Sequence, residues 1–435
     1  MTATRVSHND VSDVSWRMSR IFFNLFKRIA AKVPQSGFGD EHLIYHTIAI
    51  NSCKYHFARI LSVPEDVMST QIIGARIKAL REERGLSQDA LADMFGFKDR
   101  QTVSAIETGE RRVSAEELIV AVEKLGARLE YFTDPFLLVG EGRFSWRQTD
   151  VGPQRLGAYE RMAGRWIAAF RVIAPQVGVE RPLLRPALPL HKRSTFEEAM
   201  EAGERFAAEF ELGPVPAASL RGVMERALHI LVLDVDALAG ISGAACRLPE
   251  LDAVLINRVE PLGRRHFDLA HELLHLLTWD AMPPEHSEAA TEAGGNRVEQ
   301  LANNFASALL MPTTVLDQFG DTAGLETPAL VAWLNDTAHA LQVTASALKW
   351  RLVAMKRLSA LAARAIPDAA LRNNGREPAE AAPPPLFSGP FMATLAKALD
   401  EGRISVRRAA GLLDLTVEDL ADTFAAQGVQ PPFEP

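Results

Sequence analysis

The chain has 435 residues, a length that predicts roughly two to four globular domains. With 47% hydrophobic and 23% charged residues, its composition is that of ordinary soluble proteins. It contains no apolar run of about 18 residues or more, and arginine and lysine interrupt the N-terminal apolar stretch, which excludes a transmembrane helix and a signal peptide. Two distant cysteines exclude a disulfide framework, and a formal charge of -8 gives no global nucleic-acid signal. We therefore expect a cytoplasmic protein without membrane contact, in which any DNA contact comes from a local patch.

Residues 1–67 predict a small helical extension, because apolar residues recur at roughly helical spacing in two segments. The histidines of this stretch are isolated, and we interpret them as structural rather than as metal ligands: His42, His46 and His56. Met68 is an alternative start, since a recognisable domain begins just after it.

Residues 68–135 predict a row of short helices. Ser87 is placed to cap a helix over 88–95, and Asp99 is placed to cap the next helix, over 100–107, with a glycine turn between the two. Two short helices joined by a tight turn are typical of a helix-turn-helix.

The segments 85–92 and 102–111 closely resemble the phage-repressor-like (XRE) family. In that family, the glutamine that opens the second helix and the outward residues of the third helix contact double-stranded operator DNA. The resemblance implies DNA contacts by Gln88, Arg100, Gln101, Thr102 and Ser104, with Arg111 and Arg112 near phosphate. Glutamine and arginine can make paired hydrogen bonds to base edges, and arginine neutralises phosphate.

The predicted helix-turn-helix domain is not basic as a whole, with ten basic residues against twelve acidic ones. Affinity for DNA is therefore expected to depend on a homodimer. A helix-turn-helix that serves only protein contacts is the alternative.

Between the two motif-rich parts, helices are predicted over 197–210 and 217–228, followed by short apolar strands at 230–233 and 253–257. Glycines separate the two strands. An exposed strand edge at Val254–Asn257 could hold an extended peptide by backbone pairing, and a plain core strand is the equal alternative.

A helical apolar run over 267–277 contains H-E-x-x-H, made by His271, Glu272 and His275. Two histidines four residues apart lie on one helix face, where both imidazoles can reach one Zn²⁺. The glutamate between them is then placed to take a proton from water as a general base.

A second helix is predicted over 297–311, where Glu299 and Asn303 are four residues apart and share a face. A carboxylate on a helix after H-E-x-x-H is the expected third ligand of a His₂Glu site, and Asn303 could hold a ligand in place. Rival third ligands occupy the loop between the helices: His286, Glu285, Glu288 and Glu292.

The paired motifs resemble the ImmA/IrrE family of zinc metallopeptidases, and the resemblance spans roughly residues 150–360. It implies that His271, His275 and Glu299 bind zinc and that Glu272 is the general base. The departure is Leu274, where the family commonly has glycine. That position faces packing more than metal.

The C-terminal part predicts a proline-rich linker over 370–390 and a helical module over 391–435. The module again contains a helix, a turn and a helix. Because its second helix is acidic, we interpret it as a packing or partner module rather than as a second DNA reader.

The predicted fold class is α+β, mostly α: an all-α helix-turn-helix domain, a zincin-like domain over 150–365 with a small sheet, and the C-terminal helices. The predicted function is a DNA-binding regulator whose zinc endopeptidase domain cleaves a repressor or antitoxin-like regulator in a stress, phage or toxin–antitoxin response. The alternative is a non-proteolytic repressor or antitoxin in which the zinc fold is a sensor or scaffold.

Overall fold

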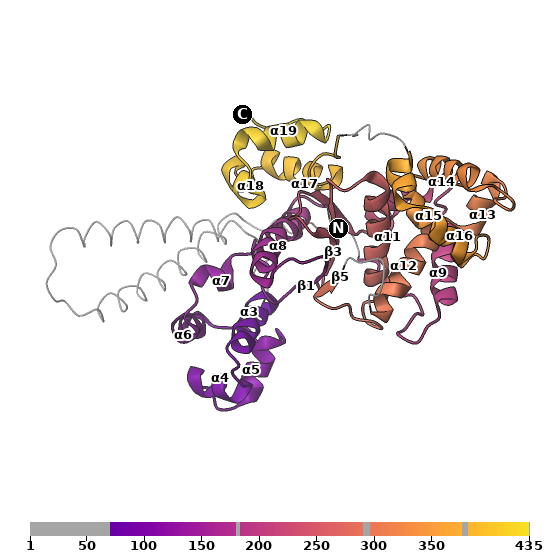
Figure 1. The fold of residues 1–435 in the computed structure, drawn as a ribbon. Coiled ribbons are helices and arrows are strands. Elements are labelled where there is room, and N and C mark those ends of the chain that lie inside the picture. Colours follow the sequence, from indigo (N-terminus) through magenta and orange to yellow (C-terminus); the bar gives the residue numbers. More distant parts are fainter. Residues whose placement is uncertain (1–69, 180–182, 290–295, 376–381, 435) are drawn as a thin grey trace, which may run out of the picture. The chain divides into compact units, whose positions relative to one another are not determined.

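The computed structural model describes residues 70–179, 183–289, 296–375 and 382–434 (Figure 1). The predicted extension over 1–67, its three histidines and Met68 lie outside the described residues. The described residues belong to one compact unit, Val63–Pro435.

The helix-turn-helix domain consists of five short helices, with the caps that the sequence predicts. The helices are α3 (Thr70–Glu83), α4 (Gln88–Phe95), α5 (Arg100–Glu107), α6 (Ala115–Leu125) and α7 (Leu129–Thr133). The Ser87 hydroxyl accepts a hydrogen bond from the Ala90 N–H, and the Asp99 carboxylate accepts one from the Thr102 N–H at 3.1 Å. Gly96 ends α4 at a φ of 74°, a left-handed conformation that favours glycine. The predicted bounds of α4 and α5 are therefore confirmed.

A buried polar network joins three of these helices. The Arg81 Nε of α3 donates to the Glu107 carboxylate of α5 at 2.6 Å, and the Gln88 Nε2 of α4 donates to the same carboxylate at 2.9 Å. The Glu107 side chain is only 3% exposed, so its charge depends on these partners. The network fixes α5 relative to α3 and α4.

Replacing Glu107 with Gln should loosen this domain, because the buried Arg81 guanidinium then loses its counter-charge. Breaking a buried pair in this way costs about 3 kcal/mol, which corresponds to roughly 100-fold faster hydrogen exchange of amides in α3–α5. Glu110→Gln makes the same change at an exposed position and should leave exchange unaltered. Equal exchange in the two variants would contradict the role of the network.

The central sheet has five strands in the order β2-β4-β3-β1-β5. Its strands are β1 (Arg143–Gln148), β2 (Leu231–Val235), β3 (Ile241–Arg247), β4 (Asp252–Asn257) and β5 (Ser287–Ala289). The β2–β4 and β1–β5 pairs are parallel, whereas β3 pairs antiparallel with both β1 and β4. The strand predictions at 230–233 and 253–257 are confirmed, and β1, β3 and β5 are additional.

The prediction that Val254–Asn257 forms an exposed edge is wrong. These residues belong to β4, which pairs with β2 on one side and with β3 on the other, so its backbone groups are already used. The core-strand alternative is the correct one.

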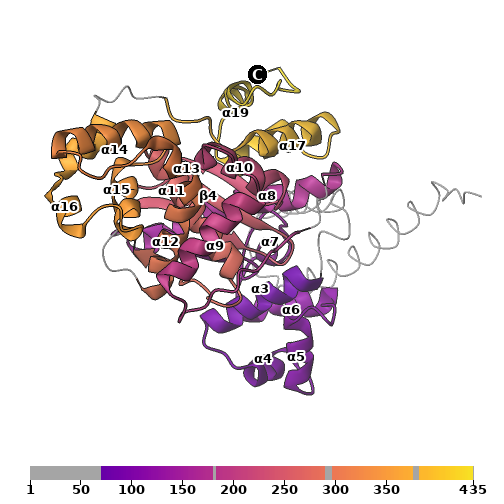
Figure 2. The same cartoon turned by 90° about the vertical axis from the view of Figure 1, so that its right-hand side faces the viewer.

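Helices cover both faces of the sheet (Figures 1 and 2). The helices that follow β1 in the chain are α8 (Pro153–Gln176), α9 (Phe196–Glu209), α10 (Pro216–Arg226), α11 (Leu262–Thr278), α12 (Arg297–Leu310), α13 (Thr313–Leu316), α14 (Thr327–Leu341), α15 (Ala345–Ala354), α16 (Ala360–Ala365), α17 (Gly389–Asp400), α18 (Val406–Leu413) and α19 (Val417–Ala426). Of these, α13–α16 pack beyond α11 and α12 rather than on the sheet (Figure 1). Short 3₁₀ helices occupy Asp317–Phe319 and Asp368–Gly375. Alternate residues of β2 point to opposite faces: Val232 packs with α9–α12, whereas Leu231 and Leu233 pack with α8.

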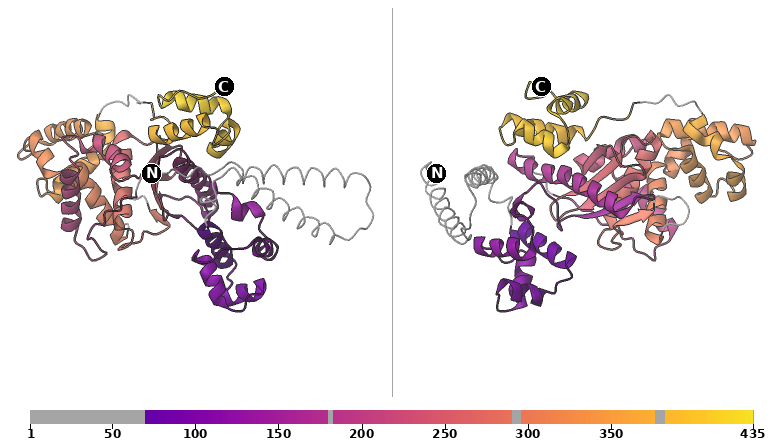
Figure 3. Two further views of the ribbon diagram at one scale, coloured as in Figure 1. Left: turned by 180° about the vertical axis from the view of Figure 1, so that it is seen from behind. Right: turned by 60° about the vertical axis from the view of Figure 1, so that its left-hand side comes forward.

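The predicted C-terminal helices correspond to α17–α19, and they share one apolar core with α8 and the sheet (Figure 3). Within the predicted linker, Phe387 forms an antiparallel bridge with Asp234 of β2 and is buried. The strand β1 begins seven residues before the predicted domain start at 150. The sheet, α8 and α17–α19 therefore form one packed body.

Candidate metal centre and nucleic-acid interface

Two helices that pack against each other bring together the predicted metal ligands. In α11, His271 and His275 are one turn apart and lie on the buried side of the helix. In α12, the Asn296 side chain accepts hydrogen bonds from the Val298 and Glu299 N–H groups. This cap places Glu299 in the first turn of α12, directed at the histidines.

The three side chains converge on one point. Each histidine Nε2 lies 3.1 Å from an oxygen of Glu299, and the two Nε2 atoms lie 3.0 Å apart. Donors held tetrahedrally at about 2.0–2.1 Å from zinc lie about 3.3 Å from one another, so these spacings and the donor set fit a metal ion. Among the described residues, His271, His275 and Glu299 are the cluster of His, Cys, Asp or Glu side chains that could hold a metal ion.

Asn303 lies where it can fix one ligand. Its Oδ1 is 3.0 Å from the His271 Nδ1, so it accepts a hydrogen bond when that nitrogen carries the proton. The His271 Nε2 is then unprotonated and directed at Glu299 and His275. This is the usual arrangement behind a metal-ligating histidine.

Burial sets the charges at the site. Burial and, to a smaller extent, the nearby Arg147 lower the pKa of His271 to about 3, so its imidazole is neutral at physiological pH. Burial also raises the pKa of Glu272 well above its usual range, while Arg147 opposes that rise. A neutral imidazole is the form that binds metal, so the depressed pKa of His271 suits a ligand role.

The depressed pKa of His271 predicts how the stability of the metal-free protein depends on pH. The unfolded chain binds a proton at a pKa of about 6.5, whereas the folded chain does so only near 3, so the unfolded state holds more protons between these values. Stability should therefore fall as the pH drops below about 6.5. We expect wild type to lose up to about 1.4 kcal/mol per pH unit relative to His271→Asn, measured by urea unfolding after chelation. A difference that does not change with pH would contradict this.

The rival ligands are less suitable. His286 is exposed and its Nε2 lies 2.6 Å from Glu160. Glu285 accepts a hydrogen bond from Asn296 at 3.4 Å. Glu288 lies in β5, but the structure does not describe its side chain, and Glu292 lies outside the described residues. Glu299 is thus the carboxylate that the structure places beside both histidines.

A buried charged group that the sequence pattern does not indicate lies beside the metal-site helix α11. Arg147 of β1 is buried and lies 3.4 Å from Asp268, which is fully buried one turn before His271 and also pairs with Arg264. An isolated arginine in an unrecognised strand gives no sequence signal. The only available hint was the acidic residue inside the apolar H-E-x-x-H helix.

The predicted DNA-contacting residues differ in solvent exposure and in their hydrogen bonds within the domain. Arg100 and Gln101, at the start of α5, are exposed, as is Arg112, whereas Thr102 and Ser104 are half-buried. The Thr102 hydroxyl lies 3.3 Å from Asp99, within the cap of α5.

Two other members of the predicted set are engaged inside the domain. The Gln88 amide donates to Glu107, and the Arg111 guanidinium makes paired hydrogen bonds with Glu117 at 2.7 and 3.1 Å. The start of α5 is therefore the most available recognition surface.

Comparison with known proteins defines the class. Residues 77–132 match a helix-turn-helix family model, and residues 244–352 match the IrrE N-terminal-like domain of the M78 peptidases. The chain is thus similar to a helix-turn-helix domain in one segment and to an ImmA/IrrE-like domain in a later one, which supports the predicted arrangement, and the helices and small sheet confirm the predicted fold class.

One curated relative is the HTH-type transcriptional regulator PrpR of Mycobacterium tuberculosis, which is 24% identical over 283 residues. The match covers 55% of this chain and 56% of that relative, so the chain spans little more than half its length. No solved structure matches the chain significantly. In the described part of the chain, no helix has the length and apolar character needed to cross a membrane.

Proposed function

We propose that this protein is a DNA-binding transcriptional regulator with a zinc-dependent endopeptidase domain. The proposal rests on one observation: His271, His275 and Glu299 each place a possible ligand atom within 4.8 Å of the other two. Glu272 lies on the same helix as both histidines. The helix-turn-helix family match and the regulator named above support the DNA-binding half.

In the peptidase half, the chain's own residues divide the work. His271, His275 and Glu299 would hold zinc, and Asn303 would fix the His271 ring. Bound zinc supplies Lewis acidity, which polarises a carbonyl and lowers the pKa of water. Glu272 then takes the proton from the attacking water and delivers it to the leaving amine.

In the DNA-binding half, α5 would enter the major groove. Arg100 and Gln101 would reach base edges, with Thr102 and Ser104 beside them. Arg112 would contact phosphate, and so would Arg111 after releasing Glu117. Gln88 would contact DNA after releasing Glu107. Because the domain is not basic overall, a homodimer would supply the affinity.

The resemblance to the ImmA/IrrE family implies the substrate class: a repressor or antitoxin-like regulator, cleaved in a stress, phage or toxin–antitoxin response. The test is to incubate the zinc-loaded protein with the regulators encoded beside its gene and to follow cleavage by mass spectrometry. Cleavage of one of them at a defined bond is expected. No cleavage of any of them or of the chain itself would contradict the peptidase half.

A second candidate is favoured by the closure of the site. His271, Glu272 and Glu299 are 0–4% exposed, so a peptide does not reach them in this conformation. A non-proteolytic regulator, in which the zinc fold is a sensor or scaffold, would keep this closed form. It predicts that removing zinc changes DNA affinity while the zinc-loaded protein cleaves nothing.

A further inference from the structure

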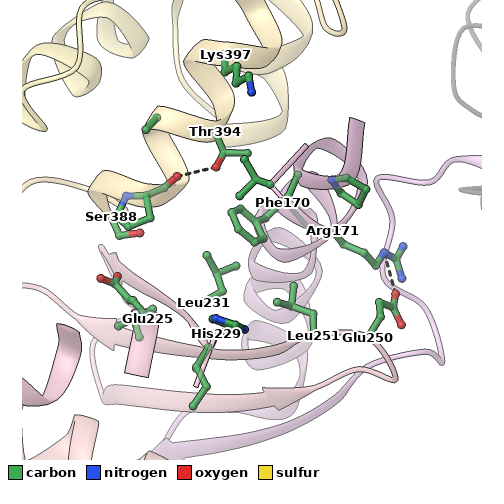
Figure 4. Close-up of a pocket in the computed structure, with 17 residues that line it drawn as sticks. Phe170, Arg171, Glu225, His229, Leu231, Glu250, Leu251, Ser388, Thr394 and Lys397 are labelled. Atoms are coloured by element: carbon green, nitrogen blue, oxygen red, sulfur yellow. Dashed lines mark hydrogen bonds and ion pairs between the residues drawn. The ribbon is translucent and has the colours of Figure 1, made fainter. Parts of the chain in front are cut away.

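A cavity of about 380 Å³ lies between α8, the start of β2 and α17, away from the metal centre (Figure 4). None of the residues of the metal centre lines it. Phe170, Leu231 and Leu251 form its apolar middle, while Arg171 and Glu250 meet at one side. Its size and its apolar walls are those of a small-molecule site.

The polar group that distinguishes the cavity is Arg171. This residue is only 9% exposed, and its Nε and Nη1 atoms are buried without a hydrogen-bond partner. The Glu250 carboxylate lies 3.7 Å from Nε, too far for a hydrogen bond, and its side chain is half exposed. A ligand carboxylate could therefore displace Glu250 and accept a hydrogen bond from the buried Nε–H.

The other side of the same guanidinium holds the segment that connects the helix-turn-helix domain to the sheet. The Arg171 Nη2 donates to the Pro135 carbonyl at 3.0 Å, and its Nη1 lies 3.9 Å from Glu141. Glu141 in turn accepts a hydrogen bond from Arg76 of α3 at 3.1 Å.

Arg76 ties the same segment to the DNA-binding domain. It is fully buried and also donates to the Tyr131 and Leu137 carbonyls, at 3.0 and 2.7 Å. Arg76 of the helix-turn-helix domain and Arg171 of α8 thus both contact residues 134–141, and both lie close to the Glu141 carboxylate. If Arg171 changes its hydrogen-bond partners, its contacts with Pro135 and Glu141 in this segment change as well.

We propose that the cavity binds a small, mainly apolar molecule that carries one carboxylate, and that Arg171 couples its binding to the 134–141 segment and through it to the helix-turn-helix domain. The carboxylate accepts from the Arg171 Nε, Nη1 stays beside Glu141, and the apolar body fills the space between Phe170 and Leu251. Ligand binding thereby favours one arrangement of the contacts between Arg171, Glu141 and Arg76.

The test compares 4-phenylbutyrate with 4-phenyl-1-butanol, which share one apolar body and differ in the charged group. Calorimetry on the full chain should show at least tenfold tighter binding of the acid. In Arg171→Met, the acid should lose that advantage while the alcohol still binds. In Ala393→Trp, which fills the cavity from an exposed position of α17 and leaves Arg171 intact, the acid should bind at least tenfold more weakly.

Hydrogen exchange reports the coupling without DNA. With 4-phenylbutyrate, amides of residues 134–141 should change their exchange rate at least threefold in wild type and stay unchanged in Ala393→Trp. Equal binding of acid and alcohol, no binding of either, or full acid binding by Ala393→Trp would overturn the site. Unaltered exchange in wild type with the acid bound would overturn the coupling. Neither readout depends on DNA binding or proteolysis.

Discussion

Peptide cleavage by the Glu272→Gln variant is expected to fall by about 10³-fold, whereas its zinc content stays that of wild type. The substitution keeps the shape of the buried side chain and removes the carboxylate that accepts the proton, and general-base catalysis typically contributes 10²–10⁴-fold. Because His271, His275 and Glu299 contact one another without Glu272, the metal centre is expected to persist.

Glu209→Gln is the matched control, since it makes the same change at an exposed position of α9. It should cleave at the wild-type rate. If Glu272→Gln cleaved as fast as Glu209→Gln, Glu272 would have no part in the chemistry. If it lost its zinc as well, the carboxylate would have to be counted among the ligands.

Replacing Arg100 and Gln101 together with alanine is expected to abolish specific gel shifts of the protein's own promoter. Each side chain can discriminate a base pair by about 1–3 kcal/mol, so the double change should weaken specific binding on the order of 100-fold. Both side chains are exposed and outside the buried Arg81–Glu107 network, so the domain should stay folded. Gel shifts with promoter DNA and with unrelated DNA separate specific from non-specific affinity.

Arg193→Ala removes an exposed arginine from the other domain and serves as the control. It should shift promoter DNA as wild type does. Unchanged specific shifts in the double variant would refute α5 as the recognition helix and would favour a helix-turn-helix used for protein contacts.

The sequence predicts local structure well where single residues set it. Ser87 and Asp99 each have a side-chain oxygen one turn before a free N–H, and Gly96 supplies the left-handed turn, so the bounds of α4 and α5 follow from nearest-neighbour chemistry. The two metal-site helices are equally local, because the i, i+4 spacings of their polar residues within apolar runs fix both helix and face.

The sheet is harder to predict from sequence, because its strands are defined by pairing between segments that are distant in the chain. Gly243 suggests a break, yet it lies inside β3, where a Cβ would come 2.9 Å from the Leu255 carbonyl of the neighbouring strand. A glycine that permits close strand approach cannot be told from a turn glycine without the partner strand. The place of Arg147 depends on pairing in the same way, since the β1–β3 pairing brings it near α11.

The zinc content of the purified protein, measured by atomic emission, tests the metal centre directly. We expect about one zinc per chain in wild type and in His286→Ala, and less than about a tenth of that in His271→Ala. Equal zinc in wild type and His271→Ala would contradict the assignment of the metal centre, and with it the peptidase function built on that centre.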